Sequence, residues 1–288
     1  MNSLDVAIEP LTCFKYRSGE AALRCLEEGS LYFARPDSLN DTLEAKFDYA
    51  EPEEFQRVFG QTMSEISQRR GGSALFYDPD VLPEMSQANA TENQRLRTFC
   101  DGMGVFSAAR RPDHQAMWAY YAENGRGVCF ELAWTHELMD KYQLWPVDVL
   151  YSGQPRLHNR AHDWRKAFLE LAEEHPGATL DELRQLSLEE NARRKWGIAT
   201  AARAVSTKHT DWAHENEVRL LAPKFGAIPL LAEVLKCVHY VRTDGGEWGP
   251  IMQQLYTNYP AVEHVYWQFS HGALNATATP MEFRLIPV

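Results

Sequence analysis

The 288-residue sequence lacks any run of about twenty consecutive apolar residues, so nothing in it predicts a helix that crosses a membrane. The first residues, MNSLDVAIEPLTCFKYR, lack a basic start followed by an apolar block, and no secretory signal is expected there. The five cysteines are odd in number, stand far apart and form no Cys-x-x-Cys pair. Reduced, buried thiols in a cytoplasmic protein are therefore expected.

Basic residues are outnumbered by acidic ones, 29 lysines and arginines against 40 aspartates and glutamates, which gives a formal net charge of −11. This balance disfavours sequence-independent binding to a nucleic-acid backbone, which needs clustered lysine and arginine. The basic spots Arg110-Arg111 and Arg193-Arg194-Lys195 are expected to be solvated faces, with a local pocket for a small anionic ligand as the open alternative. The GxxxxGK[ST], GxGxxG, GxSxG and HExxH motifs are missing, which removes several common nucleotide, hydrolase and metalloprotease sites.

The chain is 44% hydrophobic, enough to bury a large core. Alternating or β-branched stretches predict strands at 11–17, 30–35, 102–108, 127–132, 147–151, 215–222, 234–242, 262–269 and 281–288. Helical periodicity predicts helices over 20–28 and 52–69, and Thr179 with Glu182 fits a capping box. The layout predicts an α+β fold with a mixed, largely antiparallel sheet core and helical insertions. We expect a single domain over residues 1–288, with a mainly helical insertion at about 155–208.

The acidic segment Glu215-Asn216-Glu217-Val218-Arg219 is the strongest candidate for a functional centre. Strand alternation places Glu215, Glu217 and Arg219 on one face. The plain structural alternative is an exposed edge strand with an internal ion pair. The functional alternative is a carboxylate that holds a sugar hydroxyl and stabilises positive charge on the adjacent anomeric carbon, as glycosyl transfer requires.

The histidines give a weaker signal for a metal site. His158 and His162 are four residues apart, and His209 and His214 flank Asp211. A metal needs ligands that converge on one point, but Pro155 and Asn159 disfavour a helix at 158–162, and His209 to His214 is a five-residue step. Surface or hydrogen-bonded histidines are expected and no metal is predicted. A metal-dependent hydrolase or nuclease stays open only if these residues converge with the acidic segment.

Four segments in order resemble an uncharacterised bacterial family, the domain-of-unknown-function 2971 family. They are FKYRSGEAALRCLEEGSLYFARPDSLNDTLEAKF, MGVFSAARRPDHQAMWAYYAENGRGVCFEL, VDVLY and KHTDWAHENEVRLL. The shared pattern is an aromatic-Lys-Tyr strand, an Asn-Asp…Glu turn, a Trp-x-x-Tyr segment before a Gly-Val strand, and a Trp-x-x-Glu-x-Glu-x-Arg strand. The turn departs from the family's usual Pro-Phe-Glu, since it reads Asn-Asp-Thr-Leu-Glu at 40–44.

A more distant resemblance implies an activity. The opening strand, a helix ending in glycine, and QAMWAYYAENGRGVCFEL are similar to the ADP-ribosyltransferase fold, in which a catalytic glutamate opens a later strand, often as Glu-x-Glu. This resemblance implies NAD as a substrate. It makes Glu217 the residue that holds the ribose and stabilises the oxocarbenium-like state, with Glu215 orienting the acceptor.

The same resemblance implies where NAD would bind. The implied contacts are Tyr16 or Arg17 to the ribose or diphosphate, Ser107, Trp118 and Tyr121 around the nicotinamide, and Asn40, Asp41 and Glu44 as a rim. Core packing of Trp118 and Tyr121 is the plain alternative, and Lys15 and Arg219 could simply pair with nearby carboxylates.

The leading hypothesis is thus an NAD-using transferase or glycohydrolase of the ADP-ribosyl type, such as a toxin or defence enzyme. Its partner would be a small nucleotide, with a protein, a nucleic acid or water as the acceptor. The competing hypothesis is a non-catalytic module of the same fold that binds a nucleotide or a protein.

Overall fold

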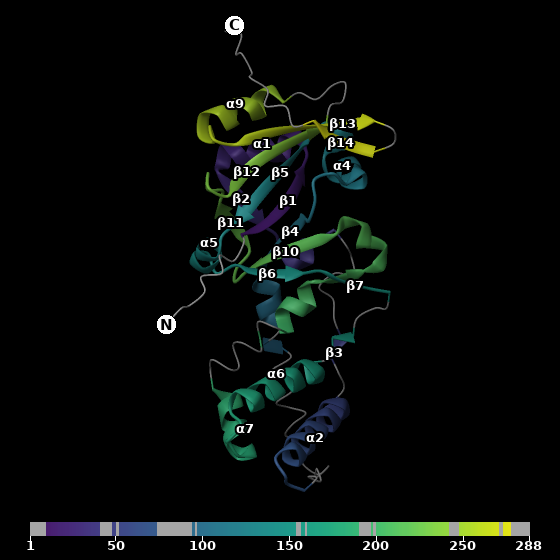
Figure 1. Cartoon of the computed structure of the whole chain (residues 1–288), viewed down its shortest axis with the longest axis vertical. Coiled ribbons are helices and arrows are strands. Elements are labelled where there is room, and N and C mark those ends of the chain that lie inside the picture. Colours follow the sequence, from purple (N-terminus) through teal and green to yellow (C-terminus); the bar gives the residue numbers. More distant parts are fainter. Residues whose placement is uncertain are drawn as a thin grey trace. The chain divides into compact units, whose positions relative to one another are not determined.

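The computed structural model describes residues 10–40, 48–49, 52–73, 94–95, 97–153, 157–158, 160–189, 197, 200–241, 248–270 and 273–277. The chain forms two compact units (Figure 1). The first comprises Met1–Arg35, Met103–Tyr151 and Thr210–Val288, and the second comprises Pro36–Gly102 and Ser152–His209. The second unit includes the expected insertion and also residues 36–102. The expectation that residues 1–288 form a single domain stays a prediction.

The first unit is built on an eight-stranded sheet with the order β14-β13-β12-β5-β1-β4-β10-β6. Its strands are β1 (Leu11–Arg17), β4 (Gly104–Ala109), β5 (Val128–Trp134), β6 (Trp145–Asp148), β10 (Glu217–Ala222), β12 (Leu235–Val241), β13 (Glu263–Ser270) and β14 (Ala273–Thr277). The pair β12–β13 is parallel, and the other pairs described in this sheet are antiparallel. The predicted α+β fold with a mixed, largely antiparallel sheet is therefore confirmed.

Shorter elements complete this unit. They are α1 (Gly19–Glu28), α4 (Gln115–Tyr121), α5 (His136–Lys141), α9 (Gly249–Asn258), η3 (Glu123–Gly125), η4 (Thr210–Glu215), and the antiparallel pair β2 (Ser30–Phe33) and β11 (Gly226–Pro229). β7 (Leu150–Ser152) spans the boundary between the units.

α1 starts where the Ser18 side chain accepts from the Ala21 amide, and it ends at Gly29 with φ 58°. Only glycine adopts that left-handed conformation readily, so the predicted helix end is confirmed.

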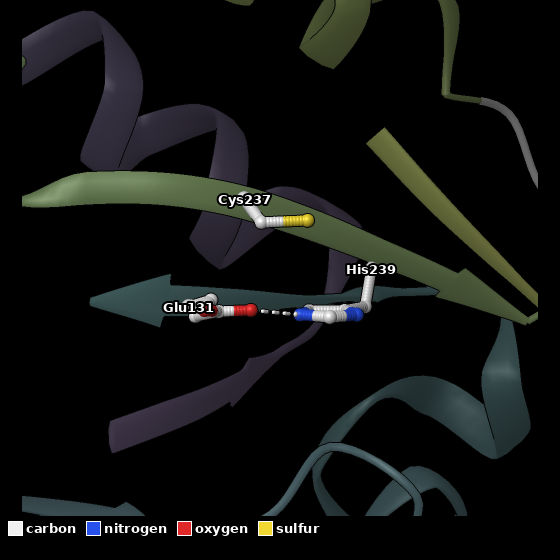
Figure 2. Close-up of side chains that lie close together, drawn as sticks. All are labelled: Glu131, Cys237 and His239. Atoms are coloured by element: carbon white, nitrogen blue, oxygen red, sulfur yellow. Dashed lines mark hydrogen bonds and ion pairs between the residues drawn. The ribbon is translucent and has the colours of Figure 1, made fainter. Parts of the chain in front are cut away.

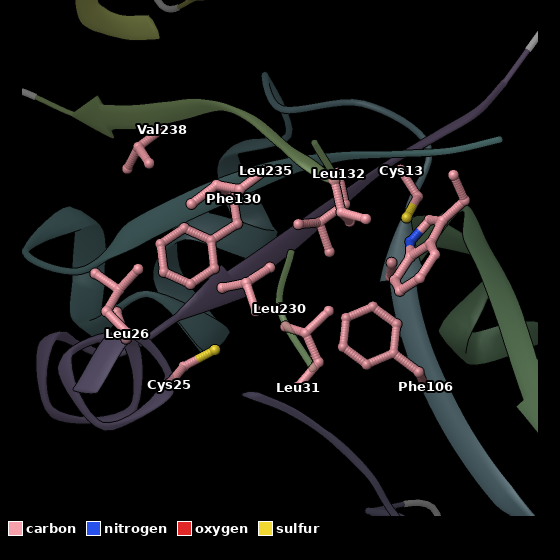
Figure 3. Close-up of a cluster of buried hydrophobic side chains, with 14 of the residues drawn as sticks. Cys13, Cys25, Leu26, Leu31, Phe106, Phe130, Leu132, Leu230, Leu235 and Val238 are labelled. Atoms are coloured by element: carbon pink, nitrogen blue, oxygen red, sulfur yellow. The ribbon is translucent and has the colours of Figure 1, made fainter. Parts of the chain in front are cut away.

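Both faces of this sheet carry apolar side chains. Figure 3 shows part of the larger cluster, in which Phe130 and Leu132 of β5 lie near Phe106 of β4 and Leu26 of α1. The helices α1 and α9 contact each other, and both contribute side chains to this cluster. A smaller cluster on the other face includes Trp118 of α4. Most of the polar groups described below lie on that second face.

The second unit is a small helical body. It contains η1 (Pro36–Ser38), α2 (Pro52–Arg69), α6 (Arg160–Glu174), α7 (Leu180–Leu188), β9 (Thr207–His209), and the parallel pair β3 (Asp48–Tyr49) and β8 (Leu157–His158). Ile66, Phe168 and Leu183 form the centre of its apolar cluster, one from each long helix. The Arg70 guanidinium donates to the carbonyls of Ala172 and His175, both at 3.0 Å, and so covers the C-terminal end of α6. The predicted helix over 52–69 is confirmed.

The capping box at α7 yields a stability prediction. Thr179 Oγ1 accepts from the Glu182 amide at 3.3 Å, and the Glu182 carboxylate accepts from the Thr179 amide at 2.7 Å. Thr179→Ala removes the first of these bonds, so the free energy of unfolding of this unit should fall by about 1 kcal/mol in urea titrations. Ser187→Ala, which removes an exposed hydroxyl late in the same helix, is the control and should change it far less. Equal losses would contradict the cap's role.

The cysteines are as expected: all five are free and buried. Burial raises the pKa of the Cys13 and Cys100 thiols to about 12, so they stay protonated and act as small apolar side chains. Within the described residues, we find no helix that is both long enough and apolar enough to span a bilayer. The predicted strand at 281–288 lies outside the described residues.

Candidate functional site

A buried ion pair opens β10. Arg219 Nε lies 2.8 Å from Glu217 Oε1, and its terminal nitrogen lies 3.2 Å from Oε2, so the two groups form a bidentate pair. The Arg219 side chain is 0% exposed and that of Glu217 is 4% exposed. β10 lies between β4 and β6 and is buried along its whole length. The expected ion pair is confirmed, whereas the alternative of an exposed edge strand was wrong.

Glu215 lies outside this strand. It ends the 3₁₀ helix η4, and Asn216 has φ 44°, a left-handed conformation that asparagine tolerates better than most residues. The strand therefore begins at Glu217, and the prediction that strand alternation places Glu215 beside Glu217 and Arg219 was wrong. Glu215 is nevertheless buried, and its Oε1 accepts a hydrogen bond of 2.5 Å from the Tyr121 hydroxyl. The end of the 3₁₀ helix η4, and not a strand, thus presents this carboxylate to α4.

Lys15 brings a cation close to both glutamates. Its Nζ donates to the Ser107 carbonyl oxygen and lies 5.0 Å from the centroid of the Phe106 ring. The Lys15 pKa is lowered to about 7, chiefly by burial and also by the Arg17 charge, while the charges of Glu217 and Glu215 partly offset both effects. The sequence predicts a carboxylate partner for this ammonium, and the structure gives it a carbonyl and an aromatic ring. An amine with this pKa exchanges protons near neutral pH.

Tyr16 and Trp118 anchor the segment that follows β4. The Tyr16 hydroxyl donates to the Arg111 carbonyl at 2.9 Å and accepts from the His114 amide, while Trp118 Nε1 donates to the Pro112 carbonyl at 2.7 Å. Their rings meet edge to face at 5.2 Å, and both residues are buried. Burial holds the pKa of the Tyr16 phenol far above its usual value. This geometry is that of core packing, and the NAD contacts assigned to these two residues stay predictions.

The other residues implied to bind NAD occupy different places. Ser107 lies opposite Arg219 in the β4–β10 register and is half-buried, and its carbonyl oxygen accepts from the Lys15 ammonium. Arg17 is half-buried at the end of β1, where burial lowers its pKa. Asn40 is exposed in the second unit, and Asp41 and Glu44 lie outside the described residues. The structure thus pairs Tyr121 with Glu215 and Ser107 with Lys15, and the charges of both glutamates act on Lys15.

Nothing in the sequence indicated the role of the Tyr151 hydroxyl, and the buried environment of Lys15 was not predicted. Tyr151 accepts a hydrogen bond of 2.9 Å from the Glu217 amide and so helps to fix the start of β10. Lys15 was expected only to form an ion pair, although its place between Phe14 and Tyr16 indicates partial burial. The alternating pattern of β1 could have raised this possibility, but the burial that lowers the pKa depends on packing against Phe106 and Ser107 of β4, about 90 residues later in the chain.

The histidines expected as metal candidates do not gather with the acidic segment in the described part of the chain. His214 Nδ1 lies 2.9 Å from the Asp211 carbonyl oxygen, and the His214 ring lies 6.3 Å from those of His114 and Tyr120. These are local packing contacts. A different group, Glu131, Cys237 and His239, is the set of described side chains that come close enough to share a cation.

Comparison with known proteins supports the first resemblance and is silent on the second. Residues 117–220 match the sequence model of the family described as "Protein of unknown function (DUF2971)". This stretch runs from α4 to β10 and includes Tyr121, Glu215, Glu217 and Arg219. No curated protein matches the chain, and no solved structure matches it.

Proposed function

We propose that the cluster around Glu215, Glu217 and Lys15 catalyses glycosyl transfer from NAD, with a protein, a nucleic acid or water as the acceptor. The observation that carries this proposal is the burial of two carboxylates around the start of β10. One of them accepts a hydrogen bond from the Tyr121 hydroxyl, and, although burial lowers the pKa of Lys15, the charges of both carboxylates raise it. Departure of nicotinamide leaves positive charge on the ribose. A carboxylate in a dry site stabilises such charge far better than it would in water.

The geometry favours Glu215 over Glu217 for that role. Both oxygens of Glu217 already meet the fully buried Arg219 guanidinium, which neutralises its charge. Glu215 accepts a hydrogen bond from the Tyr121 hydroxyl, which fixes the orientation of its carboxylate. The roles that the resemblance implies for Glu217 and Glu215 are exchanged in this proposal. Glu217 and Arg219 then support the strand, and Lys15 accepts or returns a proton near neutral pH.

Nicotinamide release from NAD tests the proposal. The wild-type protein should release nicotinamide in the presence of water, a protein mixture or nucleic acid, and Glu215→Gln should reduce the rate by about 100-fold or more, as removal of a charge-stabilising group does. Glu20→Gln, a change at an exposed helical glutamate, is the matched control and should retain the rate. Circular dichroism establishes that each variant is folded.

Three results would overturn the proposal. The first is no release by the wild-type protein with any of these acceptors, and the second is an unchanged rate in Glu215→Gln. The third is NAD binding without turnover, which would favour the competing hypothesis of a nucleotide-binding module. The buried, free thiols fit a cytoplasmic setting for either function.

A further inference from the structure

Glu131, Cys237 and His239 form a compact group on the sheet, separate from the residues of the proposed active site. Glu131 is on β5, and Cys237 is its direct partner on β12. His239 is two residues further along β12, so its side chain points to the same face as that of Cys237. Figure 2 shows the three side chains turned toward one another between the two strands.

The distances fit a bound cation after a small adjustment. One ligand atom from each residue lies within 4.8 Å of the other two, and His239 Nε2 lies 2.9 Å from Glu131 Oε2. Tetrahedral zinc, with bonds of about 2.0–2.3 Å, places its ligand atoms about 3.3–3.6 Å apart. The thiol must therefore move in by no more than about 1.5 Å, and the imidazole and carboxylate must separate by about 0.5 Å.

The ligand types narrow the choice of cation. A thiolate selects against magnesium and calcium, and a mixed set of sulfur, imidazole and carboxylate is typical of zinc. Cys237 and His239 are buried, whereas the Glu131 side chain is 29% exposed, which leaves a route for the ion and for water. We propose that Glu131, Cys237 and His239 bind a divalent cation of the zinc class, with the fourth position open to water.

Trp267 forms a hydrogen bond that competes with metal binding, and its fluorescence can be used to detect that binding. Its indole N–H donates to His239 Nδ1 at 3.1 Å. Because an indole nitrogen can only donate, the single proton of the neutral imidazole lies on Nε2, where it bonds Glu131. A cation bound at Nε2 displaces the proton from that nitrogen, and the neutral imidazole then carries its proton on Nδ1. Nδ1 can no longer accept, so the Trp267 hydrogen bond must break. Trp267 fluorescence should therefore change on metal binding.

Metal analysis and titration test the site. Zinc is measured in protein purified without chelator, and chelator-treated protein is then titrated with Zn²⁺ and with Co²⁺. We expect retained zinc, a sulfur-to-cobalt charge-transfer band and a change in Trp267 emission. Cys237→Ser should weaken zinc binding at least about 100-fold, since even residues behind a ligand typically contribute about 10–100-fold. Cys25→Ser, at a buried thiol that donates to the Ser30 carbonyl, is the control and should bind normally.

A second variant separates metal binding from folding. Trp267→Phe removes the competing hydrogen bond, so it should bind zinc about fivefold more tightly and lose the fluorescence response. Glu131→Gln should weaken binding and keep the fold. The proposal is overturned if the wild-type protein retains no zinc and shows no charge-transfer band. Equal affinity in Cys237→Ser and Cys25→Ser would also overturn it, because the metal would then lie elsewhere.

Discussion

Arg219→Met is expected to lower the free energy of unfolding by about 3–5 kcal/mol, because it leaves the Glu217 carboxylate charged, buried and without the guanidinium that it faces. Methionine is unbranched and flexible and reaches about as far as the arginine Nε, so it fills part of the vacated space. Urea unfolding, followed by circular dichroism and by tryptophan fluorescence, measures the change. At this magnitude the unfolding midpoint should shift far beyond experimental error.

Two further variants identify the cause. Arg219→Met combined with Glu217→Leu removes both charges and should recover most of the lost stability, since apolar pairs often replace buried ion pairs at little cost. Arg24→Met breaks the exposed pair with Glu20 and should change stability by less than about 1 kcal/mol. If the double variant is as unstable as Arg219→Met alone, packing and not charge explains the loss.

Lys15 is expected to make the stability of the protein rise with pH above neutrality. The folded protein holds the Lys15 proton with a pKa of about 7, whereas the unfolded chain holds it with the ordinary lysine pKa of about 10.4. Between these values the unfolded chain binds more protons, so raising the pH favours the folded state. The contribution of this group is at most about 1.4 kcal/mol per pH unit, and it vanishes below pH 7.

Comparison with Lys15→Met isolates this effect. The stability difference between the variant and the wild-type protein should be constant below pH 7 and should shift in favour of the wild-type protein by on the order of 1–2 kcal/mol between pH 7 and 8.5. Higher pH is avoided, because buried thiols such as Cys13, whose pKa is raised to about 12, act in the opposite direction there. A difference that does not vary with pH would show that the folded protein does not perturb Lys15.

The elements predicted well from the sequence are those fixed by local chemistry. The 52–69 helix, the Thr179 capping box and the helix end at Gly29 follow from periodicity, a side-chain hydrogen bond and a left-handed glycine. Glu215 was misplaced because strand alternation was extended through Asn216, whose positive φ breaks the strand. α9 was missed because its sequence, GPIMQQLYTN, has only two fully buried positions.

The candidate site could be predicted only in part from the sequence, for a different reason. The Glu217–Arg219 pair could be predicted because two residues on one strand face are neighbours in sequence. The contact between Tyr121 and Glu215 spans 94 residues, and that between Glu131 and His239 spans 108. Such contacts depend on which strands pair and in what register, which alternation within one segment does not specify.

The helical unit has a consequence for how the chain folds as it is synthesised. α2 ends at Arg69, and its partner α6 begins at Arg160, about 90 residues later. At about 5–20 residues per second, roughly 5–18 seconds separate the two helices on a ribosome. During that interval the apolar side of α2, which includes Ile66, has neither Phe168 nor Leu183 to pack against. In the nascent chain these apolar side chains therefore lack their partners for a time that is set by translation speed.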